Sequence, residues 1–575
     1  MSPHRNLILL VLPLALLASP SFAAETAETA ERILVHGNVI TVDPANPRAE
    51  AIAIRDGKIL AVGSNTDILA LQGPETQLDD LGGRTVLPGF IDAHGHFSMQ
   101  AQMTFMRNIA PAPVGAVRNM ADLQREMRSQ ALAPMTQATG WVIGFGYDDS
   151  LLAENRHPTR EELDAVSNEL PVVALHVSLH LATANSKALE LAGITAATKD
   201  PPGGVIRRKP GSQEPDGVLE ESAMGMLLAQ LPKAEGPQAL LPLVAVQQTY
   251  AQQGITTIQD GATDPATLKL LQKAASSGLL ELDVVAFPLW TTAVESIADQ
   301  PVGTYDNGLK IGGVKIVLDG SPQGKTAFLS QPYEVAPEGM KAEYRGYPSM
   351  PDPAVNQYVE LFAAKGWPLL AHANGDAAAD QLLAAVEAVA ETRPEKDHRT
   401  VMIHAQTVRE DQLDRMVALG IIPSFFVAHT FFWGDWHRDS VLGKERAEKI
   451  SPANTAGKKG LRYTFHNDSP VVPPDMMRLI WTGVNRKTRS GQTLGWQERV
   501  SPMEAIEAVT INAAQQNFDE DTRGSIEKGK LADLVILQAD PLTEPPESLA
   551  EISVTETIKR GKTIFPRTPS TQSTP

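Results

Sequence analysis

Two histidines stand two residues apart in the segment VLPGFIDAHGHFS, residues 86–98, at the end of an apolar run that begins with a Pro-Gly turn. If this run is a strand, His94 and His96 share a face with Asp92, because alternate residues of a strand point the same way. Imidazole and carboxylate groups at this spacing are typical of metal ligands. The alternative is an ordinary pair of core or surface histidines, so the interpretation depends on further ligands elsewhere in the chain.

Four more residues of ligand type lie in other apolar segments. They are Lys315 in GGVKIVLDG, His372 in WPLLAHANG, His404 in TVMIHAQT and Asp468 in LRYTFHNDSP. The chain has no cysteine, which excludes disulfides and thiolate ligands, so a metal must be held by His, Asp, Glu or Lys. Packing alone is a poor explanation for all these groups if the fold brings them together.

Lys315 alternates with Val314 and Ile316, so we expect its ammonium group to point into the protein interior, where an isolated cation is costly. A lysine that reacts with carbon dioxide becomes an anionic carbamate, and its two oxygens can bridge two divalent ions. The alternative is a lysine paired with an interior acid such as Asp319 or Asp468.

The elements that carry these residues alternate between apolar strands and amphipathic helices. Helical patterns such as DAAADQLLAAVEAVAE and REDQLDRMVALG separate the strands, which predicts an α/β fold, a (β/α)8 TIM-like barrel. In such a barrel the carboxyl ends of all the strands meet on one face, where active sites are built. The predicted strands are 90–96, 255–261, 282–290, 309–320, 367–375, 400–407, 421–428 and 461–470.

The barrel is predicted to span residues 86–519, with an insertion at about 97–240 where no barrel strand is found. Short β-rich runs at 30–85 and 520–566 flank it, and they predict one small composite β-sandwich built from both termini. The polar, proline-rich end, residues 567–575, is predicted to be a disordered tail.

The first 23 residues have the layout of a secretory signal peptide. A basic start precedes an apolar run, and small residues stand at Ser21 and Ala23, so cleavage is expected near Ala23. The apolar run, residues 7–18, is short for a membrane span, so we expect an exported protein, periplasmic or secreted, with no stable membrane span after cleavage. The alternative is an uncleaved N-terminal anchor.

Acidic residues outnumber basic ones, 68 to 50, and the formal net charge is −18, which argues against nucleic acid as a partner. Hydrophobic residues at 42% and charged residues at 21% are values of a globular protein. The expected partner is a small-molecule substrate, and the sequence is compatible with a monomer or an oligomer.

Several motifs resemble the amidohydrolase superfamily, and the resemblance covers nearly the whole chain. Two segments of the insertion, HLATANSKALELAGI and GGVIRRKPGSQEPDGVLEE, are similar to its amidohydrolase family 3 branch, which includes N-substituted formamide deformylases. The other motifs are LPGFIDAHGH, GITTIQDG, GGVKIVLDGSPQGKTAFL, LLAHANGDAAADQLLAAVE, MIHAQ and HNDSPVVPPD.

The resemblance implies a site for divalent metal, most simply zinc, with one or two ions because single-metal relatives also exist. His94 and His96 would bind one ion. His372 and His404 would bind the other. Lys315, if carboxylated, would bridge them.

Asp468 would contact both the metal and the bridging water, and would act as the catalytic base and then acid. The sequence departs from the family pattern just before it, because His466 and Asn467 stand where smaller residues are expected.

The expected activity is hydrolysis of a carbon–nitrogen bond in an amide, an N-formyl or N-acyl compound, or a cyclic amide, through metal-activated water. The same site could serve an esterase, a lactonase or a deaminase. A non-catalytic binding or regulatory barrel protein is the third interpretation, but it has no need for an acid beside four histidines and a buried lysine.

Three further residues are candidates for substrate binding. His180 in the insertion could reach over the site, although a lone histidine in an apolar segment is at least as often structural. His429 and Trp433 lie in FFVAHTFFWGDWH after the seventh predicted strand, together with Phe432, and could form an apolar wall for a bulky substrate. Packing between loops explains these aromatic residues equally well.

Overall fold

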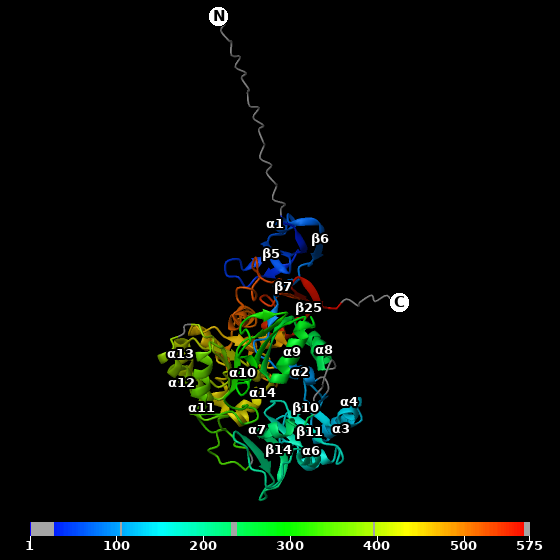
Figure 1. Cartoon of the computed structure of the whole chain (residues 1–575), viewed down its shortest axis with the longest axis vertical. Coiled ribbons are helices and arrows are strands. Elements are labelled where there is room, and N and C mark those ends of the chain that lie inside the picture. The colour runs from blue at the N-terminus through cyan, green and yellow to red at the C-terminus, as the bar shows by residue number, and fades with distance from the viewer. Residues whose placement is uncertain (2–27, 104–105, 232–238, 338, 395–396, 568–575) are drawn as a thin grey trace.

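The computed structural model describes residues 1, 28–103, 106–231, 239–337, 339–394 and 397–567. The expected signal peptide, residues 1–23, and residues 568–575 of the expected tail lie outside this part of the chain, apart from Met1. In Figure 1 the N-terminal strands lie at one end of the long axis beside the last strands of the chain, and the insertion lies at the other end. The sheets that carry the ligand-type residues lie between them. No helix in the described part is long and apolar enough to cross a membrane.

Two five-stranded sheets form the central body, and all their strand pairs are parallel except β17 with β18. The carboxyl ends of parallel strands therefore meet at one edge of each sheet. The first sheet has the order β17 Tyr305–Asp306, β18 Leu309–Ile311, β16 Asp283–Pro288, β15 Ile255–Thr263 and β8 Phe90–Ile91. The second has the order β19 Val314–Val317, β20 Leu369–Ala373, β21 Val401–His404, β22 Ile422–Phe425 and β23 Thr464–Phe465.

The predicted strand 309–320 is divided in the structure. Its first part is β18 in one sheet and its second part is β19 in the other, with Gly312 and Gly313 between them. A Cβ atom at Gly313 would overlap the carbonyl oxygen of Pro368, so only glycine permits this approach of two backbones. The expectation of one continuous strand was wrong. The close approach of the backbones at Gly313 and Pro368 has no sign in the sequence other than the glycine pair.

The two sheets touch at two places. At one, Leu289 and Lys315 form a parallel bridge, and the Trp290 N–H donates to the Lys315 carbonyl at 2.8 Å. At the other, the Asp468 N–H donates to the His94 carbonyl at 3.0 Å. Within the described residues the strand ladder does not run as one closed barrel, but the arrangement is an α/β, TIM-barrel-like one.

Helices cover these sheets, with α8 and α9 on one side and α11 to α13 on the other in Figure 1. Local sequence sets their ends: Asp264 caps α9 by accepting from the N–H groups of Ala266 and Thr267, and Gly420 ends α13 in the left-handed conformation. The helices of the central body are α8 Leu240–Ala251, α9 Pro265–Ser276, α10 Ala293–Ile297, α11 Asp352–Ala364, α12 Asp376–Thr392, α13 Glu410–Leu419, α14 His429–Trp436, the π-helix η2 His437–Val441, α15 Gly443–Ala447, α16 Ala453–Lys458, α17 Met476–Asn485, the 3-10 helix η3 Trp496–Glu498, α18 Pro502–Ala508 and α19 Ile511–Gln516.

The insertion has its own six-stranded sheet and its own apolar cores. Its strand order is β13 Gly204–Arg208, β14 Pro215–Glu221, β12 Leu181–Ala184, β11 Val172–His176, β10 Val142–Tyr147 and β9 Arg107–Asn108. Its helices are α2 Phe97–Met103, α3 Met120–Ala131, α4 Pro134–Thr139, α5 Arg160–Asp164, α6 Ser186–Leu191 and α7 Ser222–Leu228.

Segments from both ends of the chain share one six-stranded sheet, in which β24 pairs antiparallel with β7. Its order is β26 Lys562–Phe565, β25 Val554–Lys559, β24 Leu534–Leu537, β7 Thr85–Pro88, β2 Asn38–Ile40 and β3 Arg48–Ala49. A four-stranded sheet has the order β5 Lys58–Gly63, β4 Ala51–Arg55, β1 Ala30–Val35 and β6 Gln72–Asp80, and the remaining helices are α1 Asn65–Leu69 and the 3-10 helix η4 Pro546–Glu551. Leu34 and Ile52 pack in one apolar cluster with Leu534 and Ile558, so both ends of the chain contribute to that core.

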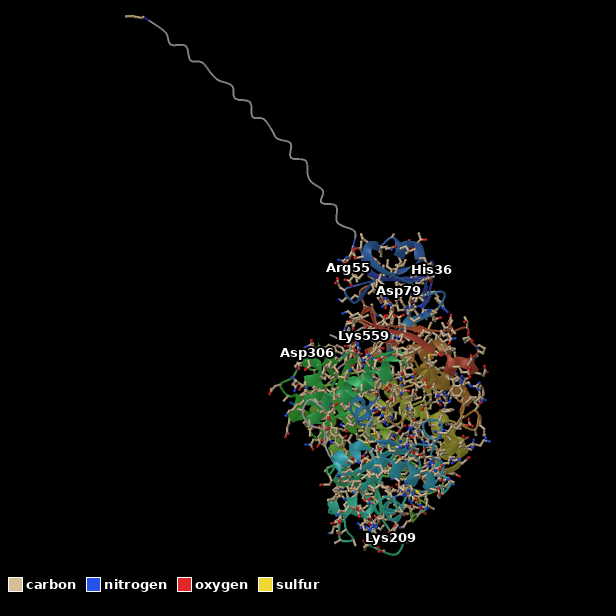
Figure 2. All side chains as sticks on the ribbon, turned by 90° about the vertical axis from the view of Figure 1, so that its right-hand side faces the viewer. His36, Arg55, Asp79, Lys209, Asp306 and Lys559 are labelled. Carbon is tan, nitrogen blue, oxygen red and sulfur yellow. The ribbon has the colours of Figure 1, made fainter. Side chains whose placement is uncertain are left out.

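A buried group of ion pairs joins the first central sheet to the C-terminal strands. Asp283, the first residue of β16, accepts from Lys559 Nζ at 2.6 Å, Arg523 Nη1 at 2.7 Å and Arg560 Nη2 at 2.7 Å. Burial alone would raise the pKa of Asp283, but the three cations lower it below its ordinary value. Figure 2 labels Lys559 at the junction between the two parts. This group lies at the amino end of a strand, opposite the carboxyl ends, and is therefore structural.

Candidate metal centre

His94 and His96 lie in the loop after β8, not within a strand as the spacing predicts. His96 forms an isolated bridge with Asp260, and the His94 ring packs so closely on Gly261 that a side chain there would overlap it. The two imidazoles nevertheless converge: both Nε2 atoms approach Asp468 Oδ1, at 3.4 Å from His94 and 3.3 Å from His96. The two rings are thus close together, as expected, but the conformation of the loop brings them together and not the shared face of a strand.

His372 and His404 lie on the neighbouring parallel strands β20 and β21, near their carboxyl ends. Their rings are 4.4 Å apart between centroids, and His404 Nε2 is 3.2 Å from His372 Nδ1. His404 has a φ of 71° and Asp468 a φ of 57°, values that are uncommon for residues other than glycine. Such backbone conformations concentrate at functional sites, where the surrounding structure holds them.

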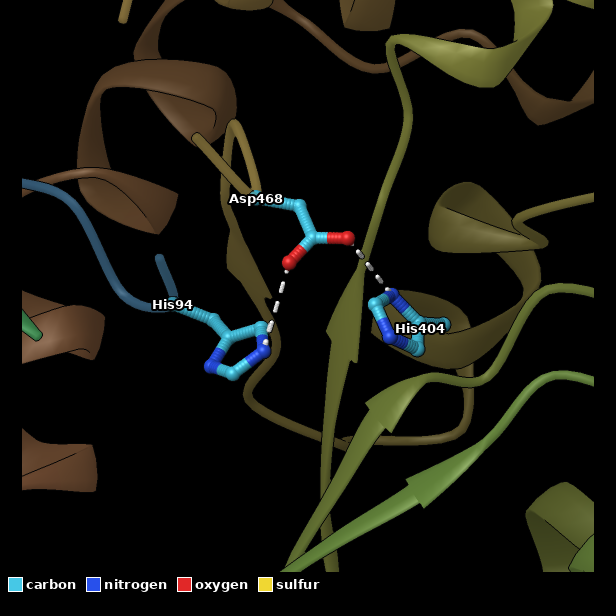
Figure 3. Close-up of side chains that lie close together, drawn as sticks. All are labelled: His94, His404 and Asp468. Carbon is cyan, nitrogen blue, oxygen red and sulfur yellow. Dashed lines mark ion pairs between the residues drawn. The ribbon is translucent and has the colours of Figure 1, made fainter. Parts of the chain in front are cut away.

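Asp468 lies between the histidine pairs. Figure 3 shows its carboxylate with one oxygen toward His94 and the other toward His404. Its Oδ2 is 4.0 Å from His404 Nδ1, and its Oδ1 is buried without a hydrogen-bond partner among the described residues. A carboxylate that reaches both histidine pairs can contact two ions or one ion and a water.

Lys315 is buried in β19, with its Nζ 3.0 Å from His94 Nε2. Burial lowers the pKa of Lys315 to about 7, although the charge of Asp468 opposes this shift. Among the described residues Lys315 forms no ion pair, and Asp319 instead accepts from the N–H groups of Asn374 and Gly375 at 2.9 and 2.7 Å. These contacts do not favour the alternative in which an interior acid neutralises the lysine.

His466 also belongs to this cluster. Its Nε2 is 3.2 Å from His404 Nδ1, and its ring centroid is 5.4 Å from that of His94. Ser424 Oγ lies 2.9 Å from His466 Nδ1 and orients the ring. The sequence shows this residue only as a departure from a family pattern, although its place two residues before Asp468 was a signal that it shares the same edge of the sheet.

The residues of this cluster fit a divalent cation. Burial holds the pKa of His94, His372 and His404 well below the ordinary value, and lowers that of His466 to about 3. Neutral imidazoles offer the lone pairs that metals need. His96 Nδ1 and Asp468 Oδ1 are buried polar atoms that lack a hydrogen-bond partner in the described part of the chain.

His180 lies beside the cluster, in the turn between β11 and β12, with its ring 5.1 Å from that of His372. Its Nδ1 is 2.8 Å from Glu221 Oε2. Burial opposes protonation of His180, but the Glu221 carboxylate outweighs it and raises the pKa above its ordinary value. His180 can therefore donate a hydrogen bond toward the site.

The other two candidates for substrate binding lie further from the cluster. His429 stacks on His437, with 2.8 Å between its Nδ1 and His437 Nε2, and Phe426 packs against both His429 and His466. Trp433 is buried and donates from Nε1 to Asp148 Oδ2 at 2.6 Å, and it also lines a cavity.

The fold and this cluster form a candidate site for divalent metal, and comparison with known proteins shows the family of the chain. A model of the amidohydrolase family matches residues 77–565. The chain therefore belongs to amidohydrolase family 3 and is a hydrolase of carbon–nitrogen bonds other than peptide bonds.

Relatives match over nearly their whole length. The chain is 29% identical over 557 residues to the N-substituted formamide deformylase of Arthrobacter pascens. The alignment covers 94% of this chain and 99% of the relative. It is 28% identical over 558 residues to the protein LONG AFTER FAR-RED 3 of Arabidopsis thaliana, covering 93% and 92%. An uncharacterized metal-dependent hydrolase from Pyrococcus horikoshii OT3 shares the fold with a TM-score of 0.70, at 24% identity over 90% of this chain and 99% of that one.

Proposed function

We propose that this protein hydrolyses the amide bond of a small N-formyl or N-acyl compound with the help of divalent metal. The observation that carries the proposal is the position of Asp468 between the histidine pairs, within 4.0 Å of both His94 and His404. The relative from Arthrobacter pascens, an N-substituted formamide deformylase, supports the formyl and acyl class.

His94 and His96 would hold one ion, and His372 and His404 a second, with His466 as a further ligand. Zinc suits such imidazole and carboxylate donors. When bound, such an ion makes water acidic enough to act at neutral pH and polarises the substrate carbonyl. We propose that Lys315 is carboxylated. Its amine is buried beside His94 and forms no ion pair with the described residues, and a carbamate would make it an anionic ligand.

The chain's own residues then move the proton. Asp468 would take a proton from the attacking water and deliver it to the leaving nitrogen, as a general base and then a general acid. His180, which Glu221 orients at 2.8 Å, would donate a hydrogen bond to the substrate carbonyl oxygen as negative charge develops there.

Three features of the whole chain also belong to this proposal. The two central sheets would be halves of one (β/α)8 barrel, which the bridge between Leu289 and Lys315 supports. The six-stranded sheet built from both termini and the four-stranded N-terminal sheet would form the composite β-sandwich. The N-terminal sequence supports export to the periplasm or the medium.

A substrate panel with zinc-loaded mature protein tests the function. N-formyl amines, N-acyl amino acids, cyclic amides, esters and lactones would be compared in the wild type and in the His372→Ala variant. We expect hydrolysis of N-formyl or N-acyl compounds, lost in the variant. Hydrolysis of lactones or esters alone, or unchanged hydrolysis of amides in the variant, would contradict the proposal.

A further inference from the structure

A cavity of about 240 Å³ is lined by residues of the insertion and of the central body, including residues that adjoin the candidate metal centre in the chain. Pro470 and Val471 line it and follow Asp468 closely in the chain. Gln100 lines it as well, and its N–H donates to the His96 carbonyl at 2.8 Å. The cavity is therefore placed to hold the part of a substrate that extends away from the cleaved bond.

Most of the wall is apolar. The insertion contributes Met106 and Phe145, and the central body contributes Phe432 and Trp433 of α14. Trp433 is fixed by its hydrogen bond to Asp148, so its ring is a rigid surface. A wall of aromatic and methionine side chains favours an apolar substituent of substantial size.

Two cations line this cavity: Arg107, which pairs with Glu126, and Arg489, whose Nε has no hydrogen-bond partner among the described residues. The Arg489 guanidinium lies 5.2 Å from the centroid of the Phe432 ring, and its Nε is buried without a hydrogen-bond partner. In the described part of the chain no ion pair of Arg489 is found. Burial lowers the pKa of Arg489, and the charges of Asp148 and Asp435 oppose this shift. The oxygens of both carboxylates already accept hydrogen bonds from other residues.

The turn that carries Arg489 is held on both sides. Thr488 Oγ1 donates to Asp435 Oδ1 at 3.1 Å, and Ser490 donates from Oγ to Oδ1 at 2.7 Å and from its backbone N–H to Oδ2 at 3.1 Å. Asp435 thus anchors the two neighbours of Arg489 and is itself satisfied. A guanidinium that is preorganised in this way, with unused donors in a partly buried cavity, matches a carboxylate.

We propose that this cavity selects substrates that carry a large apolar group together with a carboxylate, and that Arg489 binds the carboxylate. The substrate class would then be N-formyl or N-acyl derivatives of apolar amino acids or of aromatic amino-carboxylic acids. The inference rests on the proposed amide hydrolysis, which it narrows.

Three probes that differ only in the carboxylate test it. They are N-(2-phenylethyl)formamide, N-formylphenylalanine with the carboxylate next to the amide, and 4-(2-formamidoethyl)benzoic acid with the carboxylate across the ring. Steady-state kinetics and calorimetric binding to the zinc-loaded protein would be measured for the wild type, Arg489→Ala and Arg489→Lys. Lys487→Ala is the matched control, because it removes the same charge two residues away from a side chain that does not line the cavity.

We expect the wild type to prefer one of the two carboxylates over the neutral formamide. Arg489→Ala should raise KM and Kd for that carboxylate by about 10- to 100-fold, with little change in kcat, because the hydrogen bonds between the guanidinium and the substrate carboxylate are lost. Arg489→Lys should recover part of the binding. The neutral formamide should be unaffected, and Lys487→Ala should resemble the wild type.

The outcomes separate this inference from the proposed function. If the formamides are hydrolysed but Arg489→Ala changes no probe selectively, the inference is wrong and the function stands. If a carboxylate binds through Arg489 but no probe is hydrolysed, the cavity is as inferred and the reaction is wrong. If no carboxylate binds to the wild type, the inference is overturned.

Discussion

A substitution of Asp468 can distinguish a role in metal binding from a role in catalysis. The histidines and Lys315 would still hold an ion without it, whereas Asp468 is the acid that lies within 4.0 Å of members of both histidine pairs in the described part of the chain. Asp468→Asn should lower turnover by at least about 100-fold while most of the metal stays bound, because an amide cannot accept the proton of water. The melting temperature should change little, since asparagine tolerates the positive φ found here.

Turnover and metal content would be measured on the same preparation of this variant. Near-normal turnover with a full complement of metal would make Asp468 a ligand only. The proton acceptor would then be sought at His404 or His466.

Lys315 offers a second test at the scale of one residue. Lys315→Ala should lose metal and activity together, and added acetate or propionate should restore part of both, because a small acid can occupy the position of the carbamate. A crystal structure of the wild type should show the added carboxyl group on Nζ. An unmodified lysine in an active, metal-loaded crystal would disprove the carboxylation.

At the scale of elements, the ion pairs at the amino end of β16 stabilise the junction with the C-terminal strands. Asp283→Asn should lower the free energy of unfolding by about 3–5 kcal/mol, because the buried Arg523 and Lys559 and the partly exposed Arg560 lose the carboxylate that they share, although Lys559 keeps Asp533. Denaturant unfolding would measure the loss. The matched control is Asp306→Asn, an exposed aspartate in the same sheet, labelled in Figure 2, which should change stability little.

The same carboxylate predicts a dependence on pH. Its pKa in the folded state lies below the ordinary 3.8, so its stabilising effect is complete above about pH 5 and is lost as the pH falls toward the lowered value. Between about pH 5 and 2, the free energy of unfolding of the wild type should therefore fall more steeply with decreasing pH than that of Asp283→Asn. Equal slopes for the two proteins would exclude this carboxylate as the acid-sensitive group.

At the scale of the whole molecule, metal should join the two central sheets. The proposed ligands come from the loop after β8 and from β19 to β21, as well as from the segment after β23. The purified protein should contain about one to two equivalents of zinc, and chelation should abolish activity and lower the melting temperature reversibly, because binding to the folded state alone stabilises it. Full activity after exhaustive chelation, with no metal found, would contradict a metal centre.

The proposed export is tested separately. The small residues at Ser21 and Ala23 predict a mature protein that begins at or near Ala24. N-terminal sequencing of protein from the native host would check this. An intact Met1 on protein from the cytoplasmic fraction would show that the segment is not cleaved.

The type of fold and most of the cluster could be predicted from the sequence. Alternation of apolar strands with amphipathic helices predicts an α/β fold, and parallel strands must bring their carboxyl ends together, so His372 and His404 could be expected as neighbours. Family motifs carried the rest of the expected ligand set, including Lys315.

Only the tertiary structure decided which groups share the site and what surrounds them. The loop after β8 sets the positions of His94 and His96, and the glycine pair before β19 moves the chain from one sheet to the other. His466 and Arg489 depend on contacts between segments far apart in the chain, and such contacts leave no periodic pattern. Strand and helix periodicity reports which side of an element is buried, but the direction of a loop and the partner of a buried charge are set by long-range packing.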